Sequence, residues 1–521
     1  MTDANVGAMR RSLTLTGVTV NAMALIAPGA FLWTTFETQA ALSRHGTSTA
    51  DGMWAGLLLA LVLAMLTAYS YAELARIYPD AGTGSSYYFA EAAFLDKERP
   101  SHQRYARFAK LSVGWISHLY YWIYPGIMVA YTATLFGYLY SAIFHHTLSY
   151  LPLGVVAVAF ACIVGYIAYR GISGSTMTSI AVNVIQITCL LLVSVAFVWF
   201  RLAHGQAPGG FERADALHVI IPHNVIDMLY QSTIAILLLV GFESVTALGS
   251  EAVNPHRDIK RGVLISLLIQ GGVCYLFEYF AANLAIGGAT LTTGAGKTLA
   301  HGYAAASTDA APIGDMIKTV GNHYLGNSGQ ALAVLVAFTV LLALLGTALA
   351  SLNTAVRITY SMSRDKEMPA VLGLLHGRYA SPYGGVLVLT LISAGLGVFG
   401  ADPHQVDNLT QITLASNLGT FLVYGATCGI SLVAFASRHD RHIVKHLGIP
   451  ALGLTLNVLE MAGVVYIALS GSGTTPGDAY KAIAIVAVWA LIGFIWAAVN
   501  PHRKTAQAVV SERRQTAVAM N

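Results

Sequence analysis

Residues 237–244 read LLLVGFES, and residues 21–30 read NAMALIAPGA. In both stretches an apolar run suited to a helix is interrupted near its middle. Pro28 has no backbone N–H to donate, and Gly241 lowers the helical propensity of its segment. A carboxyl such as that of Glu243 is costly at bilayer depth unless it lines a cavity. Either interruption alone is often only a kink, so the surrounding sequence must distinguish a kink from a site.

The composition places most of the chain in a lipid bilayer. Hydrophobic residues make up 55% of the 521 residues, charged residues make up only 10%, and the mean hydropathy is +0.61. Soluble globular chains carry about 25% charged residues. We therefore exclude an ordinary soluble enzyme and a disordered protein. The net charge of +4, without a sustained basic face, argues against a nucleic-acid partner.

Charge-free stretches of about 20 or more residues predict twelve membrane-spanning helices. The first apolar run lacks a small-residue cleavage site, so we interpret it as the first span rather than as a signal peptide. When the N-terminus is placed inside, most of the 29 Lys and Arg residues fall in inner segments, as the positive-inside rule requires. The sequence therefore predicts a multi-pass protein of the cytoplasmic (inner) cell membrane, with both termini in the cytoplasm.

The two interruptions fall in spans one and six, which occupy corresponding positions in two halves of five spans. This spacing is typical of transporters built from inverted repeats, and it favours a binding site over two unrelated kinks. We divide the chain into a cytoplasmic N-terminus, a first repeat with spans one to five, a second repeat with spans six to ten, the last two spans, and a cytoplasmic tail. The boundaries are residues 1–13, 14–200, 201–437, 438–499 and 500–521.

Interrupted helices offer both kinds of backbone group to a small charged solute. The freed N–H groups suit a carboxylate and the freed carbonyls suit an ammonium group, so a zwitterion fits both. Glu243 is the first candidate for proton coupling, because an acid inside a membrane is a functional hypothesis by default. A hydrogen-bonded structural carboxyl is the alternative. We expect packing or snorkelling to the interface for Glu278 and Glu460, and a polar contact rather than a proton relay for His118.

Other features point away from catalysis and metal binding. The four cysteines lie within predicted spans without a CxxC pair, so we expect small buried packing residues. The sequence GAGKT at 294–298 lacks the first glycine of a phosphate-binding loop. HExxH is absent, and no GxSxG occurs in a suitable setting. We expect no enzyme activity, no cofactor and no metal. The charged segment 96–110 is predicted to be a solvated cytosolic loop near lipid headgroups.

Three sets of motifs follow spans two, six and eight. They read YAELARIYPDAG with SSYYFAE, GFE with EAVNPHRDI, and LNT with SRDKEMP, at residues 71–82 with 85–91, 241–243 with 251–259, and 352–354 with 363–369. Together they resemble the corresponding segments of amino acid permeases. The chain is identified as a member of the amino acid–polyamine–organocation (APC) superfamily, and the resemblance covers residues 14–499.

The resemblance implies an all-α polytopic membrane protein with twelve transmembrane helices and a LeuT-like five-plus-five inverted repeat, in which helices 1 and 6 are broken. It also implies alternating access around a central site, where the substrate carboxylate meets the first-span backbone and the amine meets carbonyls of the sixth span. Carried over by position, the substrate-binding residues are Ala27, Pro28, Gly29, Ala30, Tyr124, Met128, Leu237, Val240, Gly241, Phe242, Ser351 and Asn417.

The resemblance leaves the coupling ion open. Sodium-coupled relatives imply a possible ion site at Ala24, Thr347 and Ser351, whereas many proton-coupled relatives carry a lysine in span five. Gln186 stands near that position here, and a neutral amide cannot replace the sodium charge. We expect import of amino acids in symport with H⁺, with Na⁺ as the other ion. Exchange of amines, polyamines or amino acids is the alternative, followed by a membrane sensor or channel. The sequence does not name the substrate.

Overall fold

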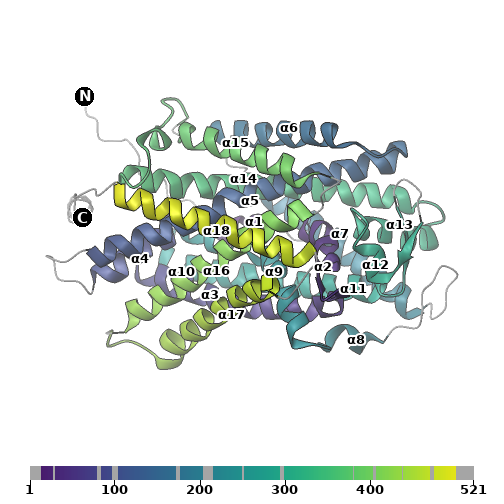
Figure 1. Cartoon of the computed structure of the whole chain (residues 1–521), viewed down its shortest axis with the longest axis horizontal. Coiled ribbons are helices and arrows are strands. Elements are labelled where there is room, and N and C mark those ends of the chain that lie inside the picture. The colour runs from purple at the N-terminus through teal and green to yellow at the C-terminus, as the bar shows by residue number, and fades with distance from the viewer. Residues whose placement is uncertain are drawn as a thin grey trace.

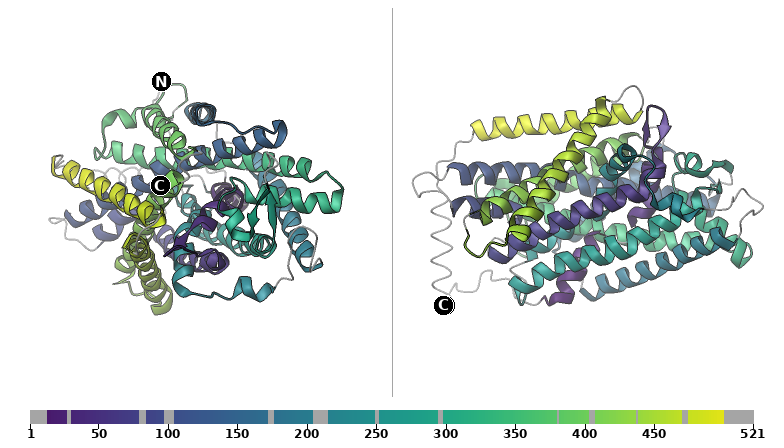
Figure 2. Two further views of the ribbon diagram at one scale, coloured as in Figure 1. Left: turned by 45° about the vertical axis from the view of Figure 1, so that its right-hand side comes forward. Right: turned by 90° about the horizontal axis from the view of Figure 1, so that it is seen from below.

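The computed structural model is almost entirely helical, with long helices running side by side along one axis (Figures 1 and 2). Two short antiparallel hairpins, β1–β2 and β3–β4, are the sheets of the described part. The structure describes residues 13–26, 30–78, 84–96, 104–171, 176–203, 215–248, 252–293, 298–379, 381–402, 407–436, 438–469 and 474–499.

The elements of the first half of the chain are α1 (Leu15–Ile26), α2 (Ala30–Ala41), β1 (Ser43–Arg44), β2 (Thr47–Ser48), η1 (Ala50–Gly52), α3 (Met53–Ile77), α4 (Ser86–Leu95), α5 (Arg104–Phe144), α6 (Tyr150–Tyr169), α7 (Thr176–Ala203), α8 (Ala216–Ile220), α9 (Val225–Leu239) and η3 (Phe242–Leu248). Those of the second half are α10 (Pro255–Leu267), η4 (Leu268–Tyr275), α11 (Leu276–Ile286), β3 (Thr290–Thr292), β4 (Thr298–His301), α12 (Gly302–Ala306), α13 (Pro312–Leu325), α14 (Gly329–Arg364), η5 (Ala370–Gly373), α15 (Tyr383–Gly400), α16 (Asp407–Phe435), η6 (Ile443–Gly448), α17 (Ile449–Leu469) and α18 (Thr474–Val499).

Eleven helical segments of the described chain are long and apolar enough to cross a membrane. They are Ala50–Ile77, Tyr105–Phe144, Tyr150–Tyr169, Ile180–Ala203, Val225–Thr246, Pro255–Ile286, Gly329–Arg364, Tyr383–Gly400, Asp407–Phe435, Ile443–Leu469 and Pro476–Val499. The chain is therefore an all-helical protein with many spans, as predicted.

The first predicted span corresponds to two shorter helices. Helices α1 and α2 contain 12 residues each, and residues 27–29 between them lie outside the described part. Neither helix alone is long enough to cross the hydrocarbon layer, which needs about 20 residues. The count of twelve spans and the inverted repeat remain predictions.

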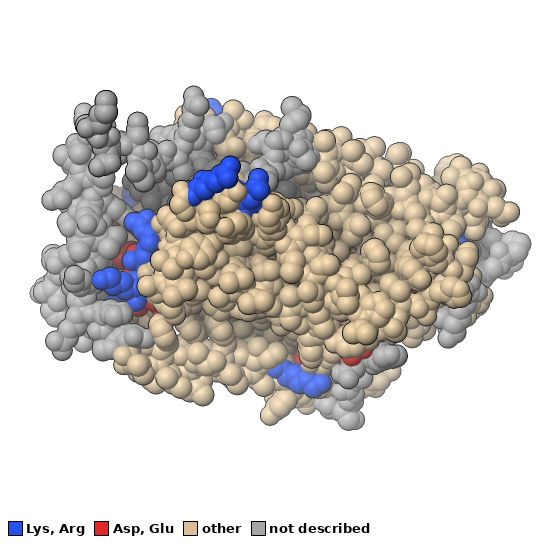
Figure 3. Space-filling model, turned by 90° about the horizontal axis from the view of Figure 1, so that it is seen from above, with Lys and Arg blue, Asp and Glu red and all other residues tan. Residues whose placement is uncertain are grey.

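Helix α5 lies at the centre of the bundle and packs against α14, α15, α16, α4 and α6. By contrast, α18 lies at the edge of the bundle (Figure 2). Only 6% of its most apolar stretch is buried inside the protein. The middle of the face drawn in Figure 3 carries almost no charged side chains. Large apolar side chains such as Leu151, Leu469 and Phe494 are exposed on the outer helices. An apolar exterior of this kind is suited to contact with lipid.

Helices α3 and α9 approach each other closely at Gly56. A Cβ atom at this position would lie 2.5 Å from the Cβ of Gln231 and 2.9 Å from the carbonyl oxygen of Met228. Small residues let membrane helices come together in this way, which increases their van der Waals contact. Glycine at this position therefore sets the distance between spans two and six.

Two sequence-based expectations about exposure are wrong. Residues 104–110 are not a solvated loop, because α5 begins at Arg104 and Lys110 is buried. The prediction of a solvated loop failed because the partners of these charged residues lie far away in the sequence. The four cysteines are free, as expected, but Cys162 is exposed on α6 rather than buried.

Candidate functional site

The sixth predicted span changes its backbone geometry at Val240 and Gly241. Helix α9 ends at Leu239, Val240 is extended (φ −71°, ψ 144°), and the 3-10 segment η3 begins at Phe242. Gly241 has a φ of +121°, in the region that favours glycine over residues with a Cβ atom. The chain therefore passes from one helix to the next within two residues.

Glu243 follows this turn directly and is fully buried. Its Oε1 accepts a hydrogen bond from the Tyr121 hydroxyl at 3.0 Å, and its Oε2 accepts one from the Tyr424 hydroxyl at 2.8 Å. The Gly241 N–H donates to the same Oε2 at 3.0 Å. A buried carboxylate without partners is costly, and hydrogen bonds to a charged group offset that cost. Donors from α5, α16 and the turn thus meet at one carboxyl.

Aromatic rings lie beside this carboxyl. The Phe242 and Tyr424 ring centroids are 5.3 Å apart, and Tyr71 lies 6.0 Å from Tyr424 and 6.1 Å from Phe242 in edge-to-face geometry. The Tyr71 hydroxyl accepts a hydrogen bond from Ser86 Oγ at 2.6 Å, and Ser86 Oγ lies 2.9 Å from Thr427 Oγ1. The ring packing and these hydroxyl contacts fix the rings from α3, η3 and α16.

The last carbonyl groups of α1 are hydrogen-bonded by side chains of the seventh predicted span. Gln270 Nε2 donates to the Met23 carbonyl at 3.0 Å, and the Tyr275 hydroxyl donates to the Ile26 carbonyl at 2.8 Å. The final carbonyls of any helix lack partners within that helix. Gln270 and Tyr275 lie in the π-helical segment η4, a geometry that often occurs at functional sites.

The structure describes most of the predicted substrate-binding residues. Ala27, Pro28 and Gly29 lie outside the described residues, and Ala30 begins α2. The remaining predicted residues are all buried: Tyr124, Met128, Leu237, Val240, Gly241, Phe242, Ser351 and Asn417. Among these, Asn417 Nδ2 donates to the Thr233 carbonyl at 2.7 Å, which joins α16 to α9. The contacts among Gly241, Phe242 and Glu243 place the span-six residues at one centre.

The predicted ion-site residues make local contacts. Thr347 Oγ1 donates to the Ala343 carbonyl at 3.0 Å and Ser351 Oγ to the Ala348 carbonyl at 3.0 Å, both within α14, while Ala24 lies in α1. These hydrogen bonds do not join the two helices. Within the described ranges, no group of three or more His, Cys, Asp or Glu side chains is arranged to hold a metal ion.

His118 makes the polar contacts that were expected of it. Its Nδ1 lies 2.6 Å from the Gly114 carbonyl oxygen and its Nε2 lies 3.0 Å from Thr359 Oγ1. Both ring nitrogens thus have a partner, one within α5 and the other on α14.

Several residues of this centre were not identified from the sequence. Tyr121 and Tyr424 supply donors to Glu243, and Gln270 and Tyr275 bind the end of α1. Tyr71 alone had a signal, because it begins the motif at 71–82. The others look like ordinary residues of apolar helices until the fold brings their partners close.

Comparison with known proteins identifies the family. The family model described as amino acid permease matches residues 12–507. The chain belongs to the amino acid permease family. This family consists of transporters of the APC superfamily, so the protein is a membrane transporter and not an enzyme.

Curated relatives of the permease have varied substrates in their names. A methylthioribose transporter of Bacillus subtilis is 22% identical over 76% of both chains. The branched-chain amino acid permease BcaP of the same organism is 23% identical over 73% of this chain and 74% of its own. The low-affinity putrescine importer PlaP of Escherichia coli is 22% identical over 94% and 93% of the two chains.

In this permease, the motifs after spans two and eight meet at Lys110. Its Nζ lies 2.8 Å from Glu91 Oε2 on α4 and 2.6 Å from Asp365 Oδ2, which follows α14. The Tyr87 hydroxyl also donates to Asp365 Oδ2, at 3.0 Å. Arg107 pairs with Glu367 at 3.1 Å beside this cluster. The motif residues therefore serve to attach α4 to α5 and α14.

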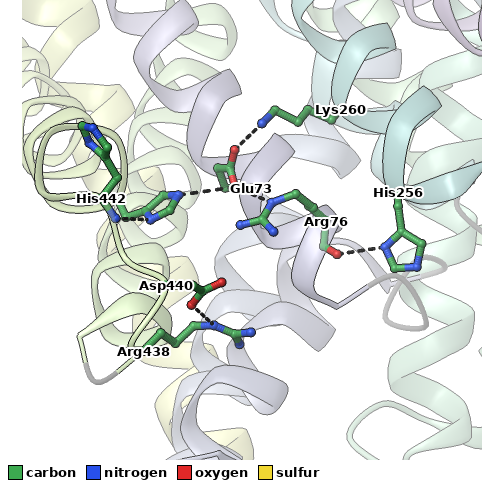
Figure 4. Close-up of polar contacts among 8 residues, drawn as sticks. Glu73, Arg76, His256, Lys260, Arg438, Asp440 and His442 are labelled. Carbon is green, nitrogen blue, oxygen red and sulfur yellow. Dashed lines mark hydrogen bonds and ion pairs between the residues drawn. The ribbon is translucent and has the colours of Figure 1, made fainter.

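A second charge cluster surrounds Glu73 at the end of α3 (Figure 4). Glu73 accepts from Lys260 Nζ at 2.5 Å and from Arg76 Nε at 2.7 Å, and His446 Nε2 lies 3.6 Å from the same carboxylate. The His256 ring contacts the Arg76 carbonyl at 3.0 Å. The cluster joins the ends of α3, α10 and η6. Together with the contacts of Lys110, it explains why the motifs after spans two and eight are rich in charged residues.

Proposed function

We propose that this permease imports amino acids across the cytoplasmic membrane by alternating access, in symport with protons, with both termini in the cytoplasm. The observation that carries the proposal is the Glu243 carboxyl, which accepts hydrogen bonds from Tyr121 on α5, Tyr424 on α16 and the Gly241 backbone. A coupling group must exchange its proton as the protein changes conformation. Glu243 has donors on separate helices, so a movement between these helices changes what stabilises it.

The proton step follows from those contacts. While both tyrosines donate to it, hydrogen bonds stabilise a negative charge on the buried carboxyl of Glu243. When α5 and α16 move away from η3, the anion loses these donors, and uptake of a proton offsets the cost of an unpaired buried charge. The substrate amine would bind at the Val240–Phe242 turn, and the substrate carboxylate would bind beside residues 27–30. Substrate binding and proton binding at Glu243 would therefore affect each other at one centre.

Uptake into proteoliposomes tests this function. The panel holds radiolabelled amino acids with apolar, polar and charged side chains, together with putrescine and methylthioribose, with and without an inward proton gradient. We expect uptake of at least one amino acid, and stimulation by the gradient. Glu243→Gln should strongly reduce the stimulation but retain exchange of internal for external substrate. No uptake of any amino acid or amine would defeat the proposal.

A matched variant separates proton coupling from the mere loss of a buried acid. Glu460 in α17 is also buried in a span, but its described hydrogen bond is the one from Ser232 Oγ at 2.6 Å. Glu460→Gln should keep the response to the proton gradient. If Glu243→Gln and Glu460→Gln behave alike, Glu243 is not the coupling group. Replacing the proton gradient by a sodium gradient in the same assay decides between the two ions.

Exchange of amines or polyamines is the second candidate. The relative named as a putrescine importer covers 94% of this chain, and the buried carboxyl of Glu243 suits an ammonium group. Preloaded putrescine that accelerates uptake of external putrescine, with no net uptake in unloaded vesicles, would favour exchange. The central site has few acids for a substrate with several positive charges, so amino acid import is the first candidate.

A further inference from the structure

Glu278 in α11 is another buried acid, and no function was predicted for it from the sequence. Its side chain is fully buried, and neither carboxyl oxygen has a hydrogen-bond partner in the described part of the chain. Of the two expectations for this residue, its burial agrees with packing and contradicts snorkelling to the membrane interface. Buried polar atoms in proteins are nearly always hydrogen-bonded, so an exception of this kind needs an explanation.

The neighbours of Glu278 on its own helix contact both parts of the interrupted first span. Tyr275, three residues earlier, donates to the Ile26 carbonyl at the end of α1. Tyr279, one residue later, has its hydroxyl 2.8 Å from Thr35 Oγ1 in α2. Residues three and four apart lie on one face of a helix. Glu278 thus lies next to two tyrosines, one of which binds the end of α1 and the other α2.

Helix α7 completes the surroundings of this acid. It packs against both α1 and α11, and Arg201 near its end lies against Gly288, just after α11. On the other side, Trp54 of α3 donates to the Leu276 carbonyl at 2.8 Å. Glu278 therefore lies on a helix that packs against both α3 and α7.

Charged groups on the neighbouring elements do not neutralise Glu278. Besides its two flanking tyrosines, the titratable side chains on these elements include Cys274, Arg201, Glu37, Tyr303, Asp315 and Lys318. Within the described residues, none of them forms a hydrogen bond or an ion pair with Glu278. An ionised carboxylate there would be buried without a donor or a counter-charge, which is strongly unfavourable. A carboxyl in these surroundings is suited to holding a proton.

The contrast with Glu243 indicates a role. Glu243 has three donors, which suits an anion, whereas Glu278 has none, which suits a protonated acid. The two buried acids therefore differ in how well hydrogen bonds would stabilise a negative charge on them. A purely structural position would be filled better by an apolar side chain of the same volume, because the unpartnered carboxyl gains nothing from its polarity.

We propose that Glu278 is a second proton carrier of the transport cycle, which rests on the proposed symport function. When α1 and α2 move, the hydroxyls of Tyr275 and Tyr279 leave Ile26 and Thr35 and become available to Glu278. The O–H bond of the acid then breaks, its electron pair remains on the carboxylate, and the proton passes to water that enters beside the first span. The two phenols donate to the new anion. The reverse movement returns them to the first span, and Glu278 takes up a proton from the other side.

The experiment measures the number of protons moved per substrate. Proteoliposomes with the wild-type protein are set at a series of substrate gradients, and the pH gradient that stops net flux of the labelled amino acid is determined for each. We expect Glu278→Gln to move one proton fewer per substrate than the wild type. Glu460→Gln, the matched loss of a buried acid on α17, should leave the number unchanged. An unchanged number in Glu278→Gln overturns the proposal.

A second variant keeps the test decisive if Glu278→Gln does not fold. The double change Tyr275→Phe and Tyr279→Phe removes the phenols that stabilise the anion and leaves the acid in place. The double variant should also move one proton fewer per substrate than the wild type. If it moves the same number of protons as the wild type, the proposed step is refuted. The wild-type protein separates the two proposals. If it takes up no substrate, the symport function fails; if it takes up substrate and both variants match it, only the role of Glu278 fails.

Discussion

Replacing Lys110 by methionine should strongly destabilise the permease. Methionine is similar in length to lysine but leaves the Glu91 and Asp365 carboxylates without the cation that lies 2.8 and 2.6 Å from them. The three side chains are only 7%, 9% and 11% exposed, so water does not replace the lost partner. Removing one partner from a buried ion pair costs about 3–5 kcal/mol. At about 1.4 kcal/mol per factor of ten, that cost corresponds to a factor on the order of 10² or more.

The rate of thermal inactivation is the suitable measurement, because large membrane proteins commonly unfold irreversibly. Purified protein in detergent is held at a fixed temperature, and the loss of the monodisperse peak in size-exclusion chromatography is followed over time. We expect Lys110→Met to lose this peak about 10²-fold faster, on the assumption that most of the cost appears in the unfolding rate. Adding Glu91→Gln and Asp365→Asn should recover most of the loss, because no unpaired buried charge then remains.

The control is an exposed ion pair of the same type. Arg438 lies 3.4 Å from Asp440, and their side chains are 36% and 58% exposed. Such pairs contribute about 0–1 kcal/mol, so Arg438→Met should change the inactivation rate only a few-fold. Equal rates for Lys110→Met and Arg438→Met would show that the Lys110 cluster does not stabilise the fold in the way described.

Two further predictions concern packing and pH. Gly56→Ala should destabilise the protein by about 1–3 kcal/mol, because the added Cβ meets Gln231 at 2.5 Å; Gly346→Ala, which has open space, is its control in thermal denaturation. In α13, outside the candidate spans, burial and then the neighbouring Asp309 carboxyl raise the pKa of Asp315 to about 9. The stabilisation that its proton provides should therefore decline as the pH rises from the ordinary aspartate range to about 9, and Asp315→Asn should flatten this decline in melting temperature measured across that range. An unchanged slope would contradict a raised pKa for Asp315.

The positions of the spans could be predicted because the hydrocarbon layer imposes a simple rule. A helix that crosses it must be long and apolar, so charge-free stretches between residues such as Arg170 and Arg201 mark spans without knowledge of any contact. The turn in span six was also visible, since glycine changes the backbone locally. Gly241 is the clearest example, because its φ of +121° is a property of one residue.

Contacts between distant segments could not be predicted in this way. Lys110 was read as a solvated loop residue because its own neighbours in the sequence are charged, but its partners come from α4 and from the end of α14. Tyr121 and Tyr424 carry no signal that they meet Glu243, since a tyrosine in an apolar helix is most often a packing residue. The motifs drew attention to these charged residues. Only the fold shows that several of the charged side chains hold neighbouring helices together.

The charge that a transporter must move decides what its buried acids can do. A zwitterionic substrate brings no net charge, so proton symport with one carrier moves one positive charge per cycle, and a second carrier increases the driving force from the same membrane potential. In this chain the two candidate carriers lie in different places, Glu243 at the turn in span six and Glu278 next to the tyrosines that contact α1 and α2. If spans one and six move together, both acids change their surroundings in the same step. In that step Tyr121 and Tyr424 leave Glu243, while Tyr275 and Tyr279 reach Glu278. The same movement would therefore protonate Glu243 and deprotonate Glu278. Net transport of both protons then requires that the two acids open to opposite sides of the membrane. Measuring the proton number in Glu243→Gln and Glu278→Gln together tests this directly: additive losses mean independent carriers, and the same loss in the double variant as in each single one means that the two acids pass on one proton.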